Sequence, residues 1–270
     1  MKGLSDRFFT IIVVFILAFG MGFFANDYLR SSAPEIVPEK IVLPVNGNFT
    51  SRSAEIKVVA VTENGEGLIG RANIELVPGK ARVLVNTNPF IEADAQQSAE
   101  MAVSYAINYT GIGLKEHDII VSFNMSDESG NYSIGSDSIV LKNQVVGGPS
   151  AGAALSVATI AVLKDQKIRD DVAITGTVEL DGNVGQVGGV MEKADAAGMA
   201  GLKIFLVPEG QEELTYYEKE LTTETRGRFQ IKKVRYVPKT LSLNNYTMSE
   251  WNMTTYEIAK VEDALAYVLE

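Results

Sequence analysis

Residues 147–163 read GGPSAGAALSVATIAVL, and this stretch indicates both the fold class and the chemistry. A Gly-Gly-Pro turn leads to Ser150, and an apolar run over residues 154–163 follows. Because this run is apolar on all sides, it predicts a helix buried in the domain interior. A serine just before such a helix can expose its hydroxyl where free N–H groups and the helix dipole hold a developing oxyanion. The alternative is an ordinary N-cap, since serine is a favoured capping residue.

A second segment, residues 175–208, reads TGTVELDGNVGQVGGVMEKADAAGMAGLKIFLVP and contains Lys193. On a predicted helix over residues 190–200, the positions three, four and seven residues after Lys193 are all alanine. The amine therefore lies on a small apolar stripe, where burial favours the neutral form that a general base requires. The alternative is a lysine whose stem follows the alanine face while its ammonium group reaches water.

The remaining patterns predict a mixed α/β (α+β) domain over residues 54–270. Apolar runs and alternation predict strands, small apolar residues at three- and four-residue spacings predict helices, and glycine clusters predict turns. Strands are expected at 54–61, 72–77, 81–85, 118–123, 172–175, 177–180, 203–208 and 228–237. Helices are expected at 93–109, 154–163, 190–200, 211–221 and 256–269, with turn material at 65–70 and a polar surface stretch at 241–255.

Composition excludes several classes of site. With no cysteine, the chain has no disulfide, no thiol nucleophile and no thiolate metal site, and its single histidine excludes a His-rich zinc site. A net charge of −10, from 34 acidic and 24 basic residues, disfavours nucleic-acid binding. The glycines of GNVGQVGG lack the G-x-G turn of a dinucleotide site. We therefore expect no metal, no cofactor and no nucleic-acid partner.

The single histidine, His117, is also a poor candidate for a Ser-His-Asp triad. It follows Lys115 and Glu116 and precedes Asp118, which places it at an exposed junction between a helix and a strand. We expect an ordinary surface histidine.

The N-terminal segment has the pattern of a membrane anchor. Residues 8–25 form an 18-residue run without charge, and such a helix is about 27 Å long, close to the thickness of a bilayer core. No small-x-small cleavage site follows, so we interpret residues 1–30 as an uncleaved single-pass anchor and the proline-bearing residues 31–53 as a linker. A cleaved signal peptide and a buried core helix are the alternatives.

Two features favour an extracytoplasmic domain at the cell membrane. Lys2 and Arg7 precede the span, which favours a cytoplasmic N-terminus. The chain also carries more glycosylation acceptor sequences than chance predicts, although a Ser/Thr-rich surface could produce them by accident. These acceptors are Asn48, Asn108, Asn124, Asn131, Asn245 and Asn252.

The two chemical segments together resemble the proteolytic domain of the Lon protease family. The family has a G-P-S-A-G motif around its nucleophile and a G-G-x-x-x-K motif that ends in its general base. Here these motifs are Gly148-Pro149-Ser150-Ala151-Gly152 and Gly188-Gly189-Val190-Met191-Glu192-Lys193. Lys193 follows Ser150 by 43 residues, close to the family spacing of about 40.

The resemblance implies a Ser-Lys dyad, with Ser150 as nucleophile, Lys193 as base and Thr175 as the residue that orients the lysine. It also implies a nucleophile loop at Gly148, Pro149 and Ala151. Polypeptide substrates and a homo-oligomeric ring, commonly a hexamer, are further implications. A membrane anchor is similar to that of archaeal-type members of the family.

Three departures from the family pattern qualify this expectation. The chain has no G-x-x-x-x-G-K-[ST] sequence for ATP binding, and Gly147 stands where many bacterial-type members have an acidic residue. The stretch over residues 226–255 is longer than is usual in the family. The function expected is an ATP-independent serine endopeptidase that cleaves unfolded or flexible polypeptides. The alternatives are a non-catalytic exported scaffold on the same fold and a protease subunit that works with a separate ATPase.

Overall fold

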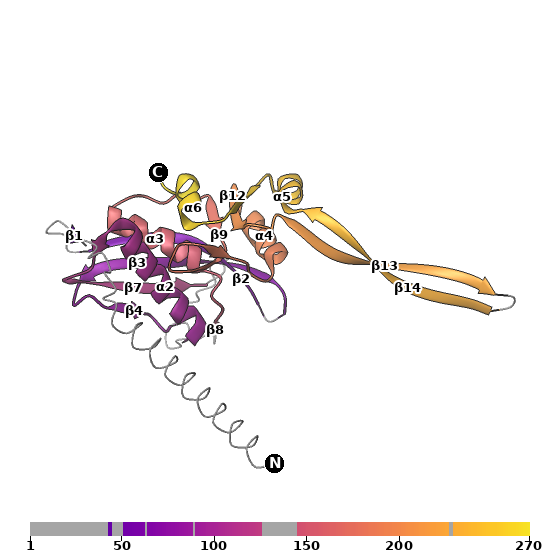
Figure 1. The fold of residues 1–270 in the computed structure, drawn as a ribbon, viewed down its shortest axis with the longest axis horizontal. Coiled ribbons are helices and arrows are strands. Elements are labelled where there is room, and N and C mark those ends of the chain that lie inside the picture. Colours follow the sequence, from indigo (N-terminus) through magenta and orange to yellow (C-terminus); the bar gives the residue numbers. More distant parts are fainter. Residues whose placement is uncertain (1–42, 45–50, 63, 89, 126–144, 227–228) are drawn as a thin grey trace, which may run out of the picture. The chain divides into compact units, whose positions relative to one another are not determined.

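A seven-stranded mixed sheet lies at the centre of the fold in the computed structural model (Figure 1). The structure describes residues 43–44, 51–62, 64–88, 90–125, 145–226 and 229–270, which belong to the unit Val42–Glu270. In spatial order, the strands of the sheet are β15 (Thr254–Ile258), β12 (Ile204–Pro208), β9 (Val172–Ile174), β2 (Arg52–Val61), β3 (Gly67–Pro78), β7 (His117–Asn124) and β4 (Val83–Val85). Strands β15, β12, β9 and β2 run parallel, whereas β3 is antiparallel to both β2 and β7. The mixed α/β fold that the sequence predicts is confirmed.

Helices cover both faces of this sheet. They are α2 (Ala93–Thr110), α3 (Gly152–Lys164), α4 (Val190–Met199), α5 (Leu243–Trp251) and α6 (Val261–Val268). The alternation of side chains along a strand assigns each helix to a face. In β9, Val172 and Ile174 belong to the core cluster that contains α2, α3 and α6, whereas Ala173 belongs to the cluster that contains α4 and α5. Helices α3 and α4 therefore pack on opposite faces.

Helix α3 is the most deeply buried helix of the described chain. Every residue from Gly152 to Leu163 is buried, as the apolar run predicts. Its two hydroxyl side chains donate back to the helix, from Ser156 to the Gly152 carbonyl at 2.8 Å and from Thr159 to the Leu155 carbonyl at 2.7 Å. These bonds satisfy polar groups that would otherwise destabilise the core.

Four short or separate strand pairs complete the described secondary structure. Three are two-residue pairs: β1 (Leu43–Pro44) with β6 (Ile112–Gly113), β5 (Phe90–Ile91) with β8 (Val145–Val146), and β10 (Thr177–Val178) with β11 (Val184–Gly185). The fourth is a long antiparallel ribbon of β13 (Glu213–Arg226) and β14 (Phe229–Ser242).

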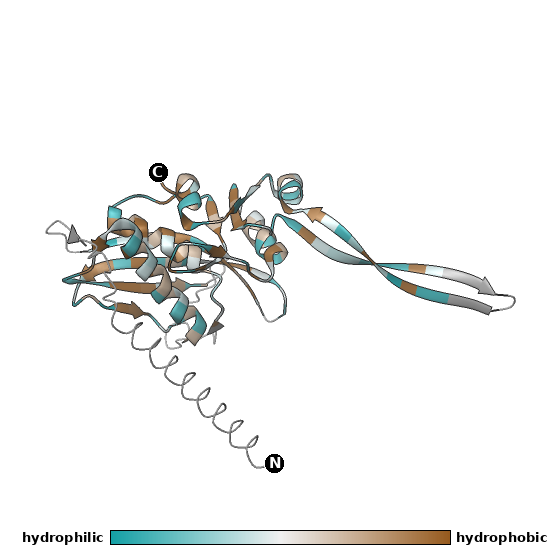
Figure 2. Ribbon diagram, in the orientation of Figure 1, coloured by the Kyte–Doolittle hydropathy of each residue, from teal (hydrophilic) through white to brown (hydrophobic). Residues whose placement is uncertain are grey.

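The ribbon corrects the prediction of a polar helix over residues 211–221. Charged residues such as Glu218, Lys219 and Glu220 have good helix propensity, which suggested a helix. The strand is instead formed by pairing with β14, a contact that local sequence does not report. Figure 2 shows hydrophilic and hydrophobic residues interspersed along both strands. The strand predicted at 228–237 is confirmed from Phe229 onward as part of β14, whereas residue 228 lies outside the described residues.

Three other boundaries differ from prediction. The stretch over 241–255 is not a surface excursion, because it forms α5 and the start of β15 and buries Leu243 and Met253. The last helix begins at Val261, since Tyr256 to Ile258 are the end of β15. Within the predicted turn over 65–70, strand β3 already begins at Gly67.

The predicted membrane span, residues 8–25, lies outside the described residues. Among the residues that the structure does describe, no helix is long and apolar enough to cross a bilayer.

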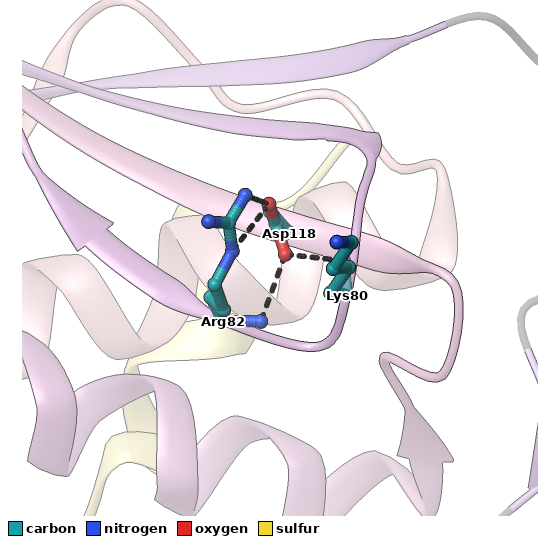
Figure 3. Close-up of polar contacts among 3 residues, drawn as sticks. All are labelled: Lys80, Arg82 and Asp118. Carbon is teal, nitrogen blue, oxygen red and sulfur yellow. Dashed lines mark hydrogen bonds and ion pairs between the residues drawn. The ribbon is translucent and has the colours of Figure 1, made fainter.

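A buried carboxylate fixes the turn between β3 and β4 (Figure 3). Asp118 is 2% exposed and accepts backbone N–H groups from Lys80 at 2.7 Å and Arg82 at 2.9 Å. The Arg82 guanidinium also donates to this carboxylate, with Nε 3.0 Å from Oδ2. These hydrogen bonds, with that from the Arg82 side chain foremost, hold the pKa of Asp118 well below its usual range. Gly79 leaves room for the carboxylate, because a Cβ there would lie 2.1 Å from the Asp118 Cγ.

We predict that Asp118→Asn lowers the urea midpoint of unfolding at pH 7. Because the pKa of Asp118 is depressed in the folded state, its charge stabilises the fold above the unfolded pKa of about 3.9. That advantage over the variant should shrink as the pH falls below about 4, as measured by urea titrations followed by circular dichroism. The matched control is Asp165→Asn, since the Asp165 side chain is 71% exposed. A difference between Asp118→Asn and the parent that is the same at pH 7 and pH 3 would contradict the assignment.

Candidate active site

The loop that contains Ser150 connects β8 to the N-terminus of α3. It turns sharply at Gly148, whose φ of 80° lies in the left-handed region that favours glycine. The loop closes when the Gly152 N–H donates to the Pro149 carbonyl at 3.1 Å, and Ser150 is left half-buried just before the helix. The N-cap position belongs to Ala151, so Ser150 is not the capping residue of α3.

Two backbone hydrogen bonds join this loop to the end of β9. The Gly176 N–H donates to the Ser150 carbonyl at 2.8 Å, and the Ala153 N–H donates to the Gly176 carbonyl at 3.0 Å. Gly176 has a φ of 152°, and a Cβ there would lie 2.4 Å from Val184 Cγ1, so only glycine fits without a shift. The position of Ser150 is thus set by the carboxyl end of a central strand.

Lys193 reaches the same strand end from the other face of the sheet. Its Nζ donates a hydrogen bond to the Thr175 hydroxyl oxygen at 3.3 Å. The Thr175 hydroxyl in turn donates to the Ser150 carbonyl oxygen at 3.4 Å. Thr175 is fully buried. The structure therefore brings together Ser150, Thr175 and Lys193, the three residues that the sequence singled out.

The environment of Lys193 favours the neutral amine. The side chain is 4% exposed, so the alternative of an ammonium group that reaches water is wrong. Burial lowers the pKa of Lys193 from 10.5 to about 8, and the neighbouring Glu192 carboxylate opposes this shift. Near pH 8, about half of the amine is therefore unprotonated.

Close packing fixes α4, which carries Lys193. A Cβ on Gly67, the first residue of β3, would lie 1.9 Å from the Glu192 carbonyl oxygen. At the helix start, Gly189 has a φ of 65°, and a Cβ there would lie 2.5 Å from Val61 Cγ2. These close contacts of α4 and its start with strands β3 and β2 fix the distance between the helix that carries Lys193 and the sheet.

A small, mainly apolar pocket of about 20 Å³, which has room for about one water molecule, lies beside Ser150. Strands β2 and β7, the nucleophile loop and the facing sides of α2 and α3 contribute its walls. The lining residues are Val58, Val59, Ala60, Ala95, Ser98, Phe123, Met125, Val146, Gly147, Gly148, Ser150, Ala151 and Leu155.

The N-terminal turns of α2 hold the nucleophile loop, a role that sequence reasoning missed. The Asp94 carboxylate accepts the Gly148 N–H at 3.1 Å, and the Ser98 hydroxyl donates to the Pro149 carbonyl at 3.1 Å. The Glu92 carboxylate occupies the space beside Gly147, where a Cβ would lie 2.0 Å from its Oε2. No sequence signal points to these residues, because they are more than 50 positions away from the loop.

His117 takes no part in the hydrogen bonds that join Ser150, Thr175 and Lys193. It begins β7, opposite Pro78. Within the described ranges, no group of three or more histidine or acidic side chains is placed to hold a metal ion.

Comparison with known proteins identifies the segment that carries these residues. Residues 143–244 match the family described as the Lon protease (S16) C-terminal proteolytic domain. This part of the chain matches a Lon-type proteolytic domain. Lon protease 1 of Myxococcus xanthus is 29% identical over 228 residues, which cover 80% of this chain and 26% of that protein.

Shorter alignments give the same family. The Lon protease of Chloroflexus aggregans is 31% identical over 56% of this chain and 17% of its own length. The Lon protease of Desulforamulus reducens is 33% identical over 36% of this chain and 12% of its own length. The chain thus spans at most about a quarter of the length of these Lon proteases.

Proposed function

We propose that this chain is a serine endopeptidase in which Ser150 is the nucleophile and Lys193 is the general base. The observation that carries the proposal is the buried amine of Lys193, held by Thr175 beside the backbone of Ser150. An amine with a pKa of about 8 can both accept and return a proton near neutral pH. The match to Lon proteases supports the same assignment.

The reaction would follow an acyl-enzyme route. Neutral Lys193 takes the proton of the Ser150 hydroxyl as the serine oxygen attacks the carbonyl carbon of the scissile peptide bond. The resulting ammonium group returns this proton to the leaving amine as the C–N bond breaks. A water molecule then attacks the ester, with Lys193 again as the base, and releases the carboxylate product.

The start of α3 supplies donors for the tetrahedral oxyanion. The Gly148 and Gly152 N–H groups already donate within the protein, to Asp94 and Pro149. We assign the oxyanion hole to the N–H groups of Ser150 and Ala151, which precede the first turn of the helix. Thr175 keeps the lysine amine directed towards the serine, so it is a positioning residue.

The pocket beside Ser150 favours an apolar substrate side chain next to the scissile bond. Its walls include Val58, Phe123, Met125 and Leu155, which offer no charge to a polar side chain. An extended chain can bring its scissile carbonyl to Ser150 beside this apolar lining, so unfolded or flexible segments are the proposed substrates.

We propose that hydrolysis by this dyad proceeds without ATP. Each step of the acyl-enzyme route moves protons and electron pairs only among Ser150, Lys193, substrate and water. Assays without nucleotide therefore test the peptidase directly.

We predict that Ser150→Ala and Lys193→Ala each reduce cleavage of an unfolded protein at least about 10³-fold, because the members of a dyad act as a unit. The far-UV circular dichroism spectrum should stay unchanged. Ser156→Ala and Lys203→Ala are the matched controls, and both should keep parental activity. Labelling by a fluorophosphonate reagent should be lost in both dyad variants and kept in both controls.

Retention of more than a few per cent of activity by either dyad variant would refute the dyad. A parent chain that neither cleaves an unfolded protein nor takes the label between pH 7 and 9 would favour a non-catalytic scaffold.

We predict that activity rises with a midpoint near pH 8. The base works only when it is unprotonated, and the pKa of Lys193 is about 8, so activity should be low at pH 6.5 and reach a plateau above pH 9. The measurement is kcat/KM for a peptide substrate across this range. His117→Ala should leave the profile unchanged, and a loss of the rising limb in that variant would show that the base is wrongly assigned.

We also propose that residues 8–25 anchor the chain and that the catalytic domain is extracytoplasmic. The four acceptor asparagines within the described residues are all exposed, which fits access by a glycosylating enzyme; they are Asn108, Asn124, Asn245 and Asn252. Protease added to right-side-out vesicles should degrade the domain, with a cytoplasmic protein as the intact control. Full protection until the membrane is opened would reverse the orientation.

A further inference from the structure

The ribbon of β13 and β14 is the one long described pair that forms no part of the central sheet. Each strand has 14 residues, so the ribbon is about 45 Å long. Figure 1 shows it extending away from the sheet and helices, and its contact with them is at its base, where Leu214 packs against the α4 and α5 core cluster. Two-stranded ribbons gain little stability on their own, which suggests a further role for this one.

The two faces of the ribbon differ in character. The register pairs Tyr217 with Pro238 and Leu221 with Val234, so these side chains share one face with Tyr236 and with Lys219, its cross-strand partner. The large apolar residues of this face are between 50% and 67% exposed. The opposite face carries the exposed Tyr216 together with more charge, including an ion pair between Lys239 and Glu218 at 3.8 Å.

Pro238 determines which backbone groups point outward. Proline has no N–H, so its pair with Tyr217 is one in which neither residue donates to the other strand. In an antiparallel ladder, pairs of this kind alternate with pairs that exchange two hydrogen bonds. Every second residue of β13 therefore directs its N–H and C=O groups to the outer edge, and these residues are Tyr217, Lys219 and Leu221. Among the described strands, none pairs with that edge.

The two edges are protected unequally. On β14, Pro238 interrupts the outward donors, and exposed cations flank it, which is how edge strands avoid pairing with other chains. Around its midpoint, β13 has neither a proline nor a run of cations. It therefore keeps a continuous edge that can accept another strand.

A second copy of this chain is a poor partner for the β13 edge. Two β13 edges would bring Glu218 and Glu220 of one copy against those of the other. Pairing of β13 with β14 of another copy would meet Pro238, which cannot donate. The edge is better suited to a chain of different sequence.

We propose that the β13 edge binds an extended segment of an unfolded polypeptide as a third strand. The inference rests on the proposed function, because an endopeptidase for unfolded chains must hold substrates that already have free backbone donors and acceptors. Strand addition uses those groups and depends little on sequence. The ribbon would then retain long substrates near the enzyme between cleavages.

The side chains of β13 set a preference within this class. A third strand beside β13 places alternate residues next to Tyr217, Lys219 and Leu221 on one face, and the residues between them next to Glu218 and Glu220. Segments in which apolar or aromatic residues alternate with lysine or arginine should bind best. Acidic segments should bind weakly.

The test compares two proline variants of one cross-strand pair in the full chain. Lys219→Pro removes an outward N–H from the β13 edge, whereas Tyr236→Pro removes one from the β14 edge opposite it. Neither substitution removes a hydrogen bond between the two strands, and Lys219→Ala controls for the loss of the lysine side chain. Two substrates are used: an unfolded protein, and a six-residue peptide with an apolar residue before the scissile bond.

We predict that Lys219→Pro raises KM for the unfolded protein about tenfold. The reason is that the substrate strand loses one or two backbone hydrogen bonds to the β13 edge. Its kcat/KM for the short peptide should stay within twofold of the parent. Tyr236→Pro and Lys219→Ala should match the parent on both substrates. Equal effects of the two prolines, or no effect of Lys219→Pro, would overturn the proposal.

Two more measurements distinguish strand addition at the β13 edge from a defect in catalysis and from self-association. Binding of a labelled unfolded polypeptide to the Ser150→Ala chain, measured by fluorescence anisotropy, does not depend on catalysis. Weaker binding after Lys219→Pro in that background would support the edge site even if the proposed peptidase activity failed. Sedimentation velocity tests self-association, and a parental oligomer that dissociates only in Lys219→Pro would show that the edge binds another copy and would refute the proposal.

Discussion

The candidate site depends on one short segment, Thr175–Gly176, at the carboxyl end of β9. The Gly176 N–H donates a hydrogen bond to the Ser150 carbonyl, and the Thr175 hydroxyl oxygen accepts one from the Lys193 amine. Helices α3 and α4 pack on opposite faces of the sheet, so their residues can meet only beyond a strand end. Strand β9 lies between β2 and β12 in the sheet, and this central position fixes the segment rigidly.

Burial of the lysine is the main energetic cost of this arrangement. A decrease in the pKa from 10.5 to about 8 corresponds to about 3 kcal/mol of free energy against the charged form. The surrounding core offsets that cost, since Val190, Ala194 and Ala197 of the same helix are buried against β9 and β12. Small alanine side chains let α4 approach the sheet closely enough to enclose the amine.

The ribbon and the central sheet follow different physical rules. In the sheet, strands such as β9 and β12 are apolar on both faces because helices cover both sides. In the ribbon, both faces meet solvent over most of the described length, so hydrophobic alternation and propensity did not identify β13, although they predicted part of β14. The mixed charges of β13 therefore suggested a helix, whereas its backbone pairing with β14 makes it a strand.

Much of the core could be predicted from the sequence. The apolar run of α3, the alanine stripe beside Lys193 and the alternation of β2 and β3 are local patterns that burial imposes directly on composition. Two of these patterns pointed to Ser150 and Lys193 as candidates, whereas Thr175 was implied only by the resemblance to the Lon protease family. Only the tertiary structure brought in Asp94 and Ser98, which hold the nucleophile loop across more than 50 residues of sequence, and only strand pairing gave the ribbon its form. Hydrophobic periodicity can be recognised in the local sequence. A hydrogen bond between residues that are distant in sequence forms only because folding brings those residues together.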